Sequence, residues 1–356
     1  MRVSRFAGLL GAILLAACAG EYPQSSIAPT TDFADRIQDL YFQIFLWSMG
    51  ILAVVWIVLA WILVRFRERP DGPEPQQIHG HLGFEIAWTI VPALIVVAIA
   101  IPTIQATFDT QTPDPDAMVV DVIGHQYWWE FRYPEIGEYR TANELHLPVG
   151  QPIALRIWST DVIHSFWVPQ LGGKRDANPL RAVPSGEERK YNWIFMTPRE
   201  TGVFMGQCAE FCGPSHSLMG MRVVVETPEE FEAWIAAWDA GHGEPAAADP
   251  RAALIELGRE TFQSGLGGCI ACHAIEGTNA QGAVGPNLTL LGRRSMIAAG
   301  WLENTEENLV RWITAPQDVK PGALMPGVND TGGGFPATNF TEEQVRAVAA
   351  YLSSLR

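Results

Sequence analysis

The sequence predicts a multidomain membrane protein with three parts: a two-helix transmembrane hairpin, an all-β barrel and a small all-α domain. Two long uncharged apolar runs predict the hairpin, short β-type runs predict the barrel, and helical periodicity beyond residue 250 predicts the last part. The 356 residues suffice for two folded domains besides the membrane segments. The formal net charge of −15 argues against a nucleic-acid partner, because phosphate binding needs a basic patch.

Residues 1–17 predict a signal peptide of the lipoprotein type. Arg2 and Arg5 precede a short apolar run, which ends in Leu15-Ala-Ala-Cys18 and resembles a bacterial lipobox. Cys18 would then be lipidated, become the mature N-terminus and hold the chain to membrane lipid. The alternative is a plain signal peptide followed by a chance cysteine. Residues 18–36 are expected to form an extracytoplasmic segment.

Residues 37–104 predict the transmembrane hairpin. The uncharged runs 41–64 and 86–104 are each long enough to cross a bilayer. Arg65, Arg67 and Arg69 open the loop between them, so the positive-inside rule places this loop in the cytoplasm. Both outer ends then face the extracytoplasmic side, in agreement with the export signal. The alternative is a pair of buried helices in a soluble core.

Residues 105–240 predict a compact β barrel or sandwich that ends in a helix. Short β-type runs bounded by Gly, Pro or Asp occur at 118–123, 152–158, 190–195 and 221–226. The segment 228–240 reads as a helix, with Thr227 as its cap.

Residues 241–249 are rich in Gly, Ala and Pro and predict a linker to a helical domain at 250–356. Helical periodicity occurs at 250–264, 304–314 and 341–354. Thr305 and Thr341 are each followed by two glutamates, which is a helix-start signal.

The densest group of metal-binding side chains lies between residues 208 and 219. Cys208, Cys212, His216 and Met219 form a soft ligand set that selects copper in an electron-transfer role. Two cysteines four residues apart can bridge two metals, and each metal then needs a terminal imidazole. His164 is the best candidate for the second imidazole. The alternative is a disulfide between the two cysteines, with His216 and Met219 incidental.

The sequence Cys269-Ile-Ala-Cys272-His273 is the attachment signature of a c-type haem. The two thiols add across the haem vinyl groups, and the imidazole binds iron. A redox or zinc motif is the alternative for a bare pair of cysteines. A sixth iron ligand is expected downstream, where His/Met ligation raises the potential. Met325 resembles the axial methionine of cytochromes c, whereas Met296 follows two arginines that make a poor apolar pocket.

From about Asp32 to Trp238 the chain resembles subunit II of haem–copper cytochrome c oxidases. The resemblance rests on the hairpin, the copper loop and the segments 124–129, 163–169 and 171–177. It implies a cupredoxin-like barrel with a dinuclear copper A centre of two copper ions. The ligands matched by position are His164, Cys208, the backbone carbonyl of Glu210, Cys212, His216 and Met219. The carboxylate of Glu210 would also reach a magnesium ion shared with subunit I.

Two further features match this family. Glu85, at the start of the second span, matches a position that leads protons into subunit I; the alternative is a carboxylate favoured at a helix N-terminus. Tyr127, Trp128 and Trp129 match the patch through which electrons reach copper, although the family usually has tryptophan first. This tyrosine weakens the case for a soluble cytochrome docking there in the usual way.

A subunit II fused to a cytochrome c domain resembles the caa-type oxidases of bacteria. The resemblance implies that electrons pass from haem c to copper A and on to haem a of subunit I, where oxygen is reduced to water and protons are translocated. This chain would hold no catalytic residue of its own. Implied partners are subunits I and III, with a soluble or membrane cytochrome c or a quinol–cytochrome c reductase as donor. The implied location is the bacterial inner membrane, with both metal-binding domains outside.

Two alternatives stay open at this point. One is the copper A and haem c subunit of a nitric oxide reductase, which would share much of the chain. The other is a non-catalytic haem c lipoprotein, which would lack copper.

Overall fold

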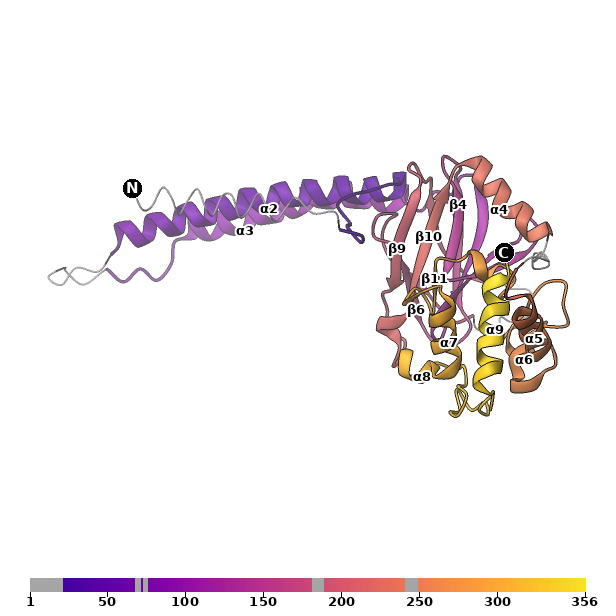
Figure 1. The fold of residues 1–356 in the computed structure, drawn as a ribbon. Coiled ribbons are helices and arrows are strands. Elements are labelled where there is room, and N and C mark those ends of the chain that lie inside the picture. The colour runs from indigo at the N-terminus through magenta and orange to yellow at the C-terminus, as the bar shows by residue number, and fades with distance from the viewer. Residues whose placement is uncertain (1–21, 68–71, 73–75, 181–188, 241–248) are drawn as a thin grey trace, which may run out of the picture.

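The computed structural model describes residues 22–67, 72, 76–180, 189–240 and 249–356. The signal peptide with Cys18, Arg69 and most of the linker lie outside these residues. Figure 1 shows a long arm of two helices, a β domain at its end and a helical C-terminal domain against the β domain.

The arm consists of α2 (Asp32–Arg65) and α3 (Leu82–Asp109), which lie side by side. Both are long and apolar enough to cross a membrane, and none of their most apolar residues is buried. The alternative of two buried core helices is therefore wrong. The first helix begins at Asp32, before the predicted apolar run that starts at residue 41. A search for uncharged runs leaves out its first turns, because they carry charged residues.

The arm is fixed to the β domain at the N-terminus of α2. Thr31 caps this helix by accepting a hydrogen bond from Ala34 N at 3.0 Å, and its hydroxyl donates to Leu171 O at 2.8 Å. Arg36 pairs with Asp109 at 2.8 Å and so joins the outer ends of the two helices. The direction of the arm is thus set by buried and local contacts at one end.

The β domain consists of two five-stranded sheets. One sheet, in the order β3-β2-β1-β5-β8, contains β1 (Met118–His125), β2 (Trp128–Tyr133), β3 (Tyr139–Ala142), β5 (Ile153–Ser159) and β8 (Asn192–Met196). The other, in the order β4-β10-β9-β6-β7, contains β4 (Glu144–Pro148), β6 (His164–Trp167), β7 (Arg175–Ala177), β9 (Gly202–Cys208) and β10 (Gly220–Glu226). The four predicted runs correspond to β1, β5, β8 and β10, which confirms them.

A single apolar core joins the sheets. Side chains of both sheets pack in it, among them Trp129 and Leu155 of the first sheet and Val223 of the second. Burial of each large apolar side chain contributes roughly 1.5–3 kcal/mol. The predicted helix α4 (Pro228–Ala240) covers one end, where Trp234 packs against Tyr133 with ring centroids 5.1 Å apart.

The C-terminal domain is helical, as predicted. It contains α5 (Ala252–Gln263), η2 (Leu266–Gly268), α6 (Cys269–Cys272), η3 (Leu291–Arg293), β11 (Met296–Ile297), β12 (Leu302–Glu303), α7 (Glu306–Thr314), α8 (Pro316–Val319) and α9 (Glu342–Ser354). Thr305 and Thr341 cap α7 and α9, which confirms both predicted helix starts. The domain meets the β domain at β10, where Gly220 N donates to Ala299 O at 2.9 Å.

Candidate copper and haem sites

The predicted copper ligands come together at one end of the second sheet. His164 lies on β6, Cys208 ends β9, and Cys212, His216 and Met219 occupy the loop before β10. This loop is closed by a hydrogen bond from Cys208 N to Met219 O at 2.8 Å. A strand end, a tight loop and a neighbouring strand thus converge, although His164 is 44 residues from Cys208.

Each cysteine lies beside one histidine. His164 Nδ1 is 3.9 Å from Cys208 Sγ, and His216 Nδ1 is 3.7 Å from Cys212 Sγ. The two sulfurs are 3.9 Å apart, and Met219 Sδ is 3.9 Å from Cys212 Sγ. Both cysteines are free, so the disulfide alternative is wrong. Two thiolates between two imidazoles, with a thioether at the side, are a donor set that suits two soft metal ions.

The hydrogen bond between the two cysteines changes the pKa of both thiols. The pKa of the Cys208 thiol is lowered, first by its hydrogen bond with Cys212 and also by His164, while the pKa of Cys212 is raised by the same pairing. The hydrogen bond therefore favours the thiolate at Cys208 over that at Cys212. Because metals bind thiolates rather than thiols, metal binding would also require Cys212 to lose its proton.

The backbone carbonyl and the side-chain carboxylate of Glu210 contact different neighbours. Its backbone carbonyl accepts from the Cys208 thiol at 3.3 Å, which is compatible with the ligand role expected for that oxygen. Its carboxylate is half-exposed and pairs with Lys174 at 3.1 Å. A magnesium ion at this carboxylate would have to share it with Lys174.

Asp161 holds one copper-site histidine in place, a role that no sequence motif indicates. His164 Nε2 lies 2.8 Å from Asp161 Oδ1, so Nδ1 is left facing Cys208. The other carboxylate oxygen accepts from Gln126 N at 2.6 Å. An acid three residues before a ligating histidine was the available signal, but acidic residues are common on the surface.

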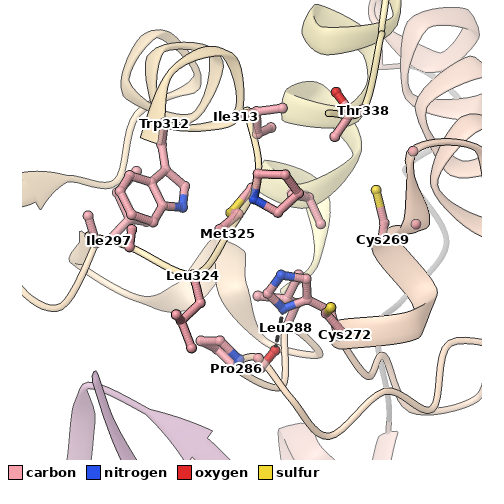
Figure 2. Close-up of a pocket in the computed structure, with 18 of the residues that line it drawn as sticks. Cys269, Cys272, Pro286, Leu288, Ile297, Trp312, Ile313, Leu324, Met325 and Thr338 are labelled. Atoms are coloured by element: carbon pink, nitrogen blue, oxygen red, sulfur yellow. Dashed lines mark hydrogen bonds between the residues drawn. The ribbon is translucent and has the colours of Figure 1, made fainter. Parts of the chain in front are cut away.

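The haem motif opens onto a large cavity of about 760 Å³. Figure 2 shows Cys269, Cys272 and Met325 around this pocket, with a dashed line at the carbonyl of Pro286. His273 Nδ1 donates to that carbonyl at 2.8 Å, which leaves Nε2 for a metal. Burial lowers the pKa of His273 and so favours the neutral imidazole that binds iron.

The walls of the cavity fit a haem. They are largely apolar, with Leu288, Ile297 and Trp312 among them. Two buried polar atoms on the walls, Arg294 Nε and Thr338 Oγ1, have no partner, as expected where a ligand with carboxylates belongs.

The zinc alternative for the cysteine pair lacks support. Among the described residues, the one group of three such side chains whose ligand atoms lie within 4.8 Å is His164, Cys208 and Cys212. Met325 and Met296 both line the haem cavity, so the cavity alone does not choose between them.

The aromatic patch lies between the two candidate sites. Tyr127 and Trp128, which belong to the β domain, line the haem cavity of the other domain. Trp129 points to the opposite side of the strand, is fully buried and lies edge-on to His164 with ring centroids 5.9 Å apart. The three aromatic residues are therefore divided between the cavity wall and the core beside the copper ligands.

Comparison with known proteins identifies the family. The transmembrane domain of cytochrome c oxidase subunit II matches residues 21–106, its periplasmic domain matches 136–227, and cytochrome c matches 255–356. Cytochrome c oxidase subunit 2 of Alkalihalophilus pseudofirmus is 36% identical over 97% of this chain and 94% of its own. The chain belongs to the cytochrome c oxidase subunit II family. The subunit 2 of Bacillus subtilis is 32% identical over 97% of this chain and 95% of its own.

A solved structure is also similar. The periplasmic domain of subunit II of cytochrome oxidase from Bradyrhizobium japonicum is 27% identical, with a TM-score of 0.32, over 36% of this chain and 98% of its own.

Membership in the family explains the two sites in broad terms. A subunit II implies copper A in the β domain, and a cytochrome c domain implies haem. It also makes the chain an electron-transfer subunit of an oxidase complex, anchored in a membrane by α2 and α3 with its soluble domains outside.

Glu85 lies at the other end of the arm from the two metal sites. Its carboxylate accepts from His81 N at 3.1 Å, just before the first turn of α3. This contact is the helix-terminal role expected of a carboxylate at that position. It is also compatible with proton uptake by the neighbouring subunit.

Proposed function

We propose that this subunit II relays electrons from haem c to copper A and on to haem a of subunit I, where oxygen reduction is coupled to proton translocation. The observation that carries the proposal is the position of Tyr127. This residue lines the haem cavity and also touches the copper loop: a Cβ at Gly213 would lie 2.4 Å from Tyr127 Oη. Its neighbour Gln126 donates from Nε2 to Cys212 O at 2.7 Å.

We assign the residues that would hold each cofactor from the sequence motifs and the family resemblance, and the side chains of each set lie near one another. Cys269 and Cys272 would attach haem c covalently, and His273 and Met325 would bind its iron. Two copper ions would be held by His164, Cys208, the carbonyl of Glu210, Cys212, His216 and Met219. When bound, these cofactors supply the one-electron redox chemistry. The protein holds the ligand side chains in place, buried or half-buried, which limits the rearrangement that accompanies each transfer.

The remaining assignments rest on membership in the family. Magnesium would bind at the carboxylate of Glu210, shared with subunit I, and Glu85 would pass protons to that subunit. Subunit III, together with a cytochrome c or a quinol–cytochrome c reductase as donor, would complete the assembly. The complex would lie in a bacterial inner membrane, with Cys18 lipidated. The domain limits proposed are 37–104, 105–240 and 250–356, with a linker at 241–249.

The test follows the order of electron arrival in the purified complex. After a flash reduces the external donor, haem c should be reduced first and copper A second. Cys212→Ser should lower the copper content below two ions per chain and leave the electron on haem c. Haem a reduction at an unchanged rate in that variant would refute the relay. A complex that reduces nitric oxide but not oxygen would favour the nitric oxide reductase alternative.

A further inference from the structure

Lys320 is a lysine buried between the two soluble domains. Its side chain is 3% exposed, and Nζ donates to the backbone carbonyl of Tyr127 in the β domain. Lysine is almost never fully buried unless it is paired, and here the partner is a neutral carbonyl. Burial lowers the pKa of Lys320 to about 7, so near neutral pH the amine is partly uncharged while still able to donate.

The next two residues also contact the β domain. The carbonyl of Pro321 accepts a hydrogen bond from the hydroxyl of Ser215, which is fully buried in the copper loop. At Gly322, φ is +84°, and a Cβ would lie 3.2 Å from Pro214. Three consecutive residues of the cytochrome domain thus lie directly on the β domain.

These contacts lie between the two candidate metal-binding loops. Ser215 immediately precedes the copper ligand His216, and Gly322 is three residues before Met325. A shift of the segment 320–322 would therefore change the position of the haem loop relative to the copper loop. We propose that residues 320–322 are the docking element that fixes this position, with the buried amine of Lys320 as its positioning residue. The inference rests on the proposed relay function.

Lys320 does more than fill space. A buried polar side chain usually stabilises a protein less than an apolar residue of similar volume. The contribution of Lys320 is therefore to orientation, because its hydrogen bond forms in only one placement of the two domains. A second contact lies elsewhere: Glu144 of β4 accepts from Ser295 N at 2.7 Å and from Met296 N at 3.3 Å. Removing the amine should therefore loosen one end of the interface while the Glu144 end holds.

The test uses the full-length subunit, loaded with haem and copper, in the purified complex. Lys320→Met keeps an apolar stem and removes the donor. Lys190→Met removes an exposed lysine and is the matched control. Hydrogen exchange in peptides covering 213–218 and 320–324 should become about tenfold faster in Lys320→Met. The reason is that the buried carbonyl of Tyr127 loses its hydrogen bond from Lys320, which weakens the contact between the domains. Peptides covering 295–300 and 342–354 should not change, and the control should behave as wild type.

Two further measurements make the test specific. The chain has three lysines, at 174, 190 and 320. An amine-acylating reagent should modify the exposed Lys190 in the wild type and spare Lys320. Lys320→Gln, which keeps a shorter N–H donor without the charge, should restore part of the protection lost in Lys320→Met.

Acylation of Lys320 as fast as that of Lys190, or unchanged hydrogen exchange in Lys320→Met, would overturn the inference. Loss of haem or copper from Lys320→Met would also overturn it, because it would indicate a role of Lys320 in folding. The relay itself is tested separately by the order of reduction in the wild type. The exchange experiment could verify the docking contacts even if electrons bypass copper A, and it could refute them even if the relay operates. Failure of the docking proposal and failure of the relay are therefore distinguishable.

Discussion

Glu130 is a buried carboxylate whose charge stabilises the β domain. Its oxygens lie 2.9 Å from His125 Nε2 and 2.8 Å from Arg132 Nε. Burial alone would raise its pKa, but the hydrogen bonds from His125 and Arg132 outweigh this and lower the pKa from 4.5 to about 2. Because the folded pKa is below the unfolded one, the contribution is fully present above pH 4.5 and is lost as the pH falls toward about 2.

We therefore expect Glu130→Gln to reduce the free energy of unfolding by up to about 3 kcal/mol at pH 7 and by progressively less in acid. Denaturant unfolding of the subunit between pH 7 and 3 measures this. Glu200→Gln changes an exposed carboxylate of the same domain and should have little effect. A difference that stays constant across this pH range would contradict the pKa assignment.

Met219 is the weakest ligand in the proposed copper set. It is fully buried, with its sulfur near Cys212, so leucine can replace it with little change in volume. Met219→Leu should retain two coppers per chain but change their reduction potential, because a thioether ligand tunes the metal. Redox titration and metal analysis test both points. Met221→Leu, at an equally buried methionine two residues away, should leave the potential unchanged.

At the scale of elements, α5 and α9 cross closely because Gly258 has no side chain. A Cβ there would lie 1.9 Å from Ala347 O and 2.8 Å from Tyr351 Cβ. Gly258→Ala should destabilise the cytochrome domain by about 2 kcal/mol or more, although alanine favours helices by about 1 kcal/mol. Denaturation followed by haem absorption measures this, with the exposed Glu260→Ala on the same helix as control. Equal or greater stability of Gly258→Ala would show that the helices do not cross there.

Elements differ in how far the sequence predicts them. The hairpin, α4, α7 and α9 could be predicted because apolar length and capping residues are local signals. Strands β6 and β7 were not predicted, since four and three residues give too short a pattern and their pairing is non-local. Of the site, the ligand motifs could be predicted from residue type and spacing. Asp161, Arg294 and Lys320 could not, because their roles depend on contacts that the fold creates.

At the scale of the whole molecule, the domain interface is the feature least accessible to sequence. Tyr127 and Lys320 are 193 residues apart, and the linker between their domains carries no signal for how they dock. Composition shows only that both soluble parts have more acidic than basic residues, which suggests mild repulsion. The structure shows instead that the interface is held by buried hydrogen bonds, at Lys320 and at Glu144.

This difference leads to a prediction about salt. Salt screens exposed charges beyond about 8–10 Å at physiological ionic strength and affects buried contacts far less. Transfer from haem c to copper A should therefore depend little on ionic strength, because the two domains are already docked. If one end of the interface opens, the tether keeps the cytochrome domain at a roughly millimolar effective concentration near the β domain. Transfer from a cationic soluble cytochrome to haem c should slow as salt rises, because that encounter depends on attraction to a chain of net charge −15.

Flash-initiated electron transfer in the intact complex, at roughly 10 to 500 mM salt, separates the two steps. An internal step that slowed steeply with salt would mean that exposed charges, rather than the buried contacts, bring the domains together. Lys320→Met sharpens the comparison, because loosening one end of the interface makes the internal step depend on re-docking. Since both domains are acidic, added salt should then leave that step unchanged or accelerate it slightly, while the external step should still slow.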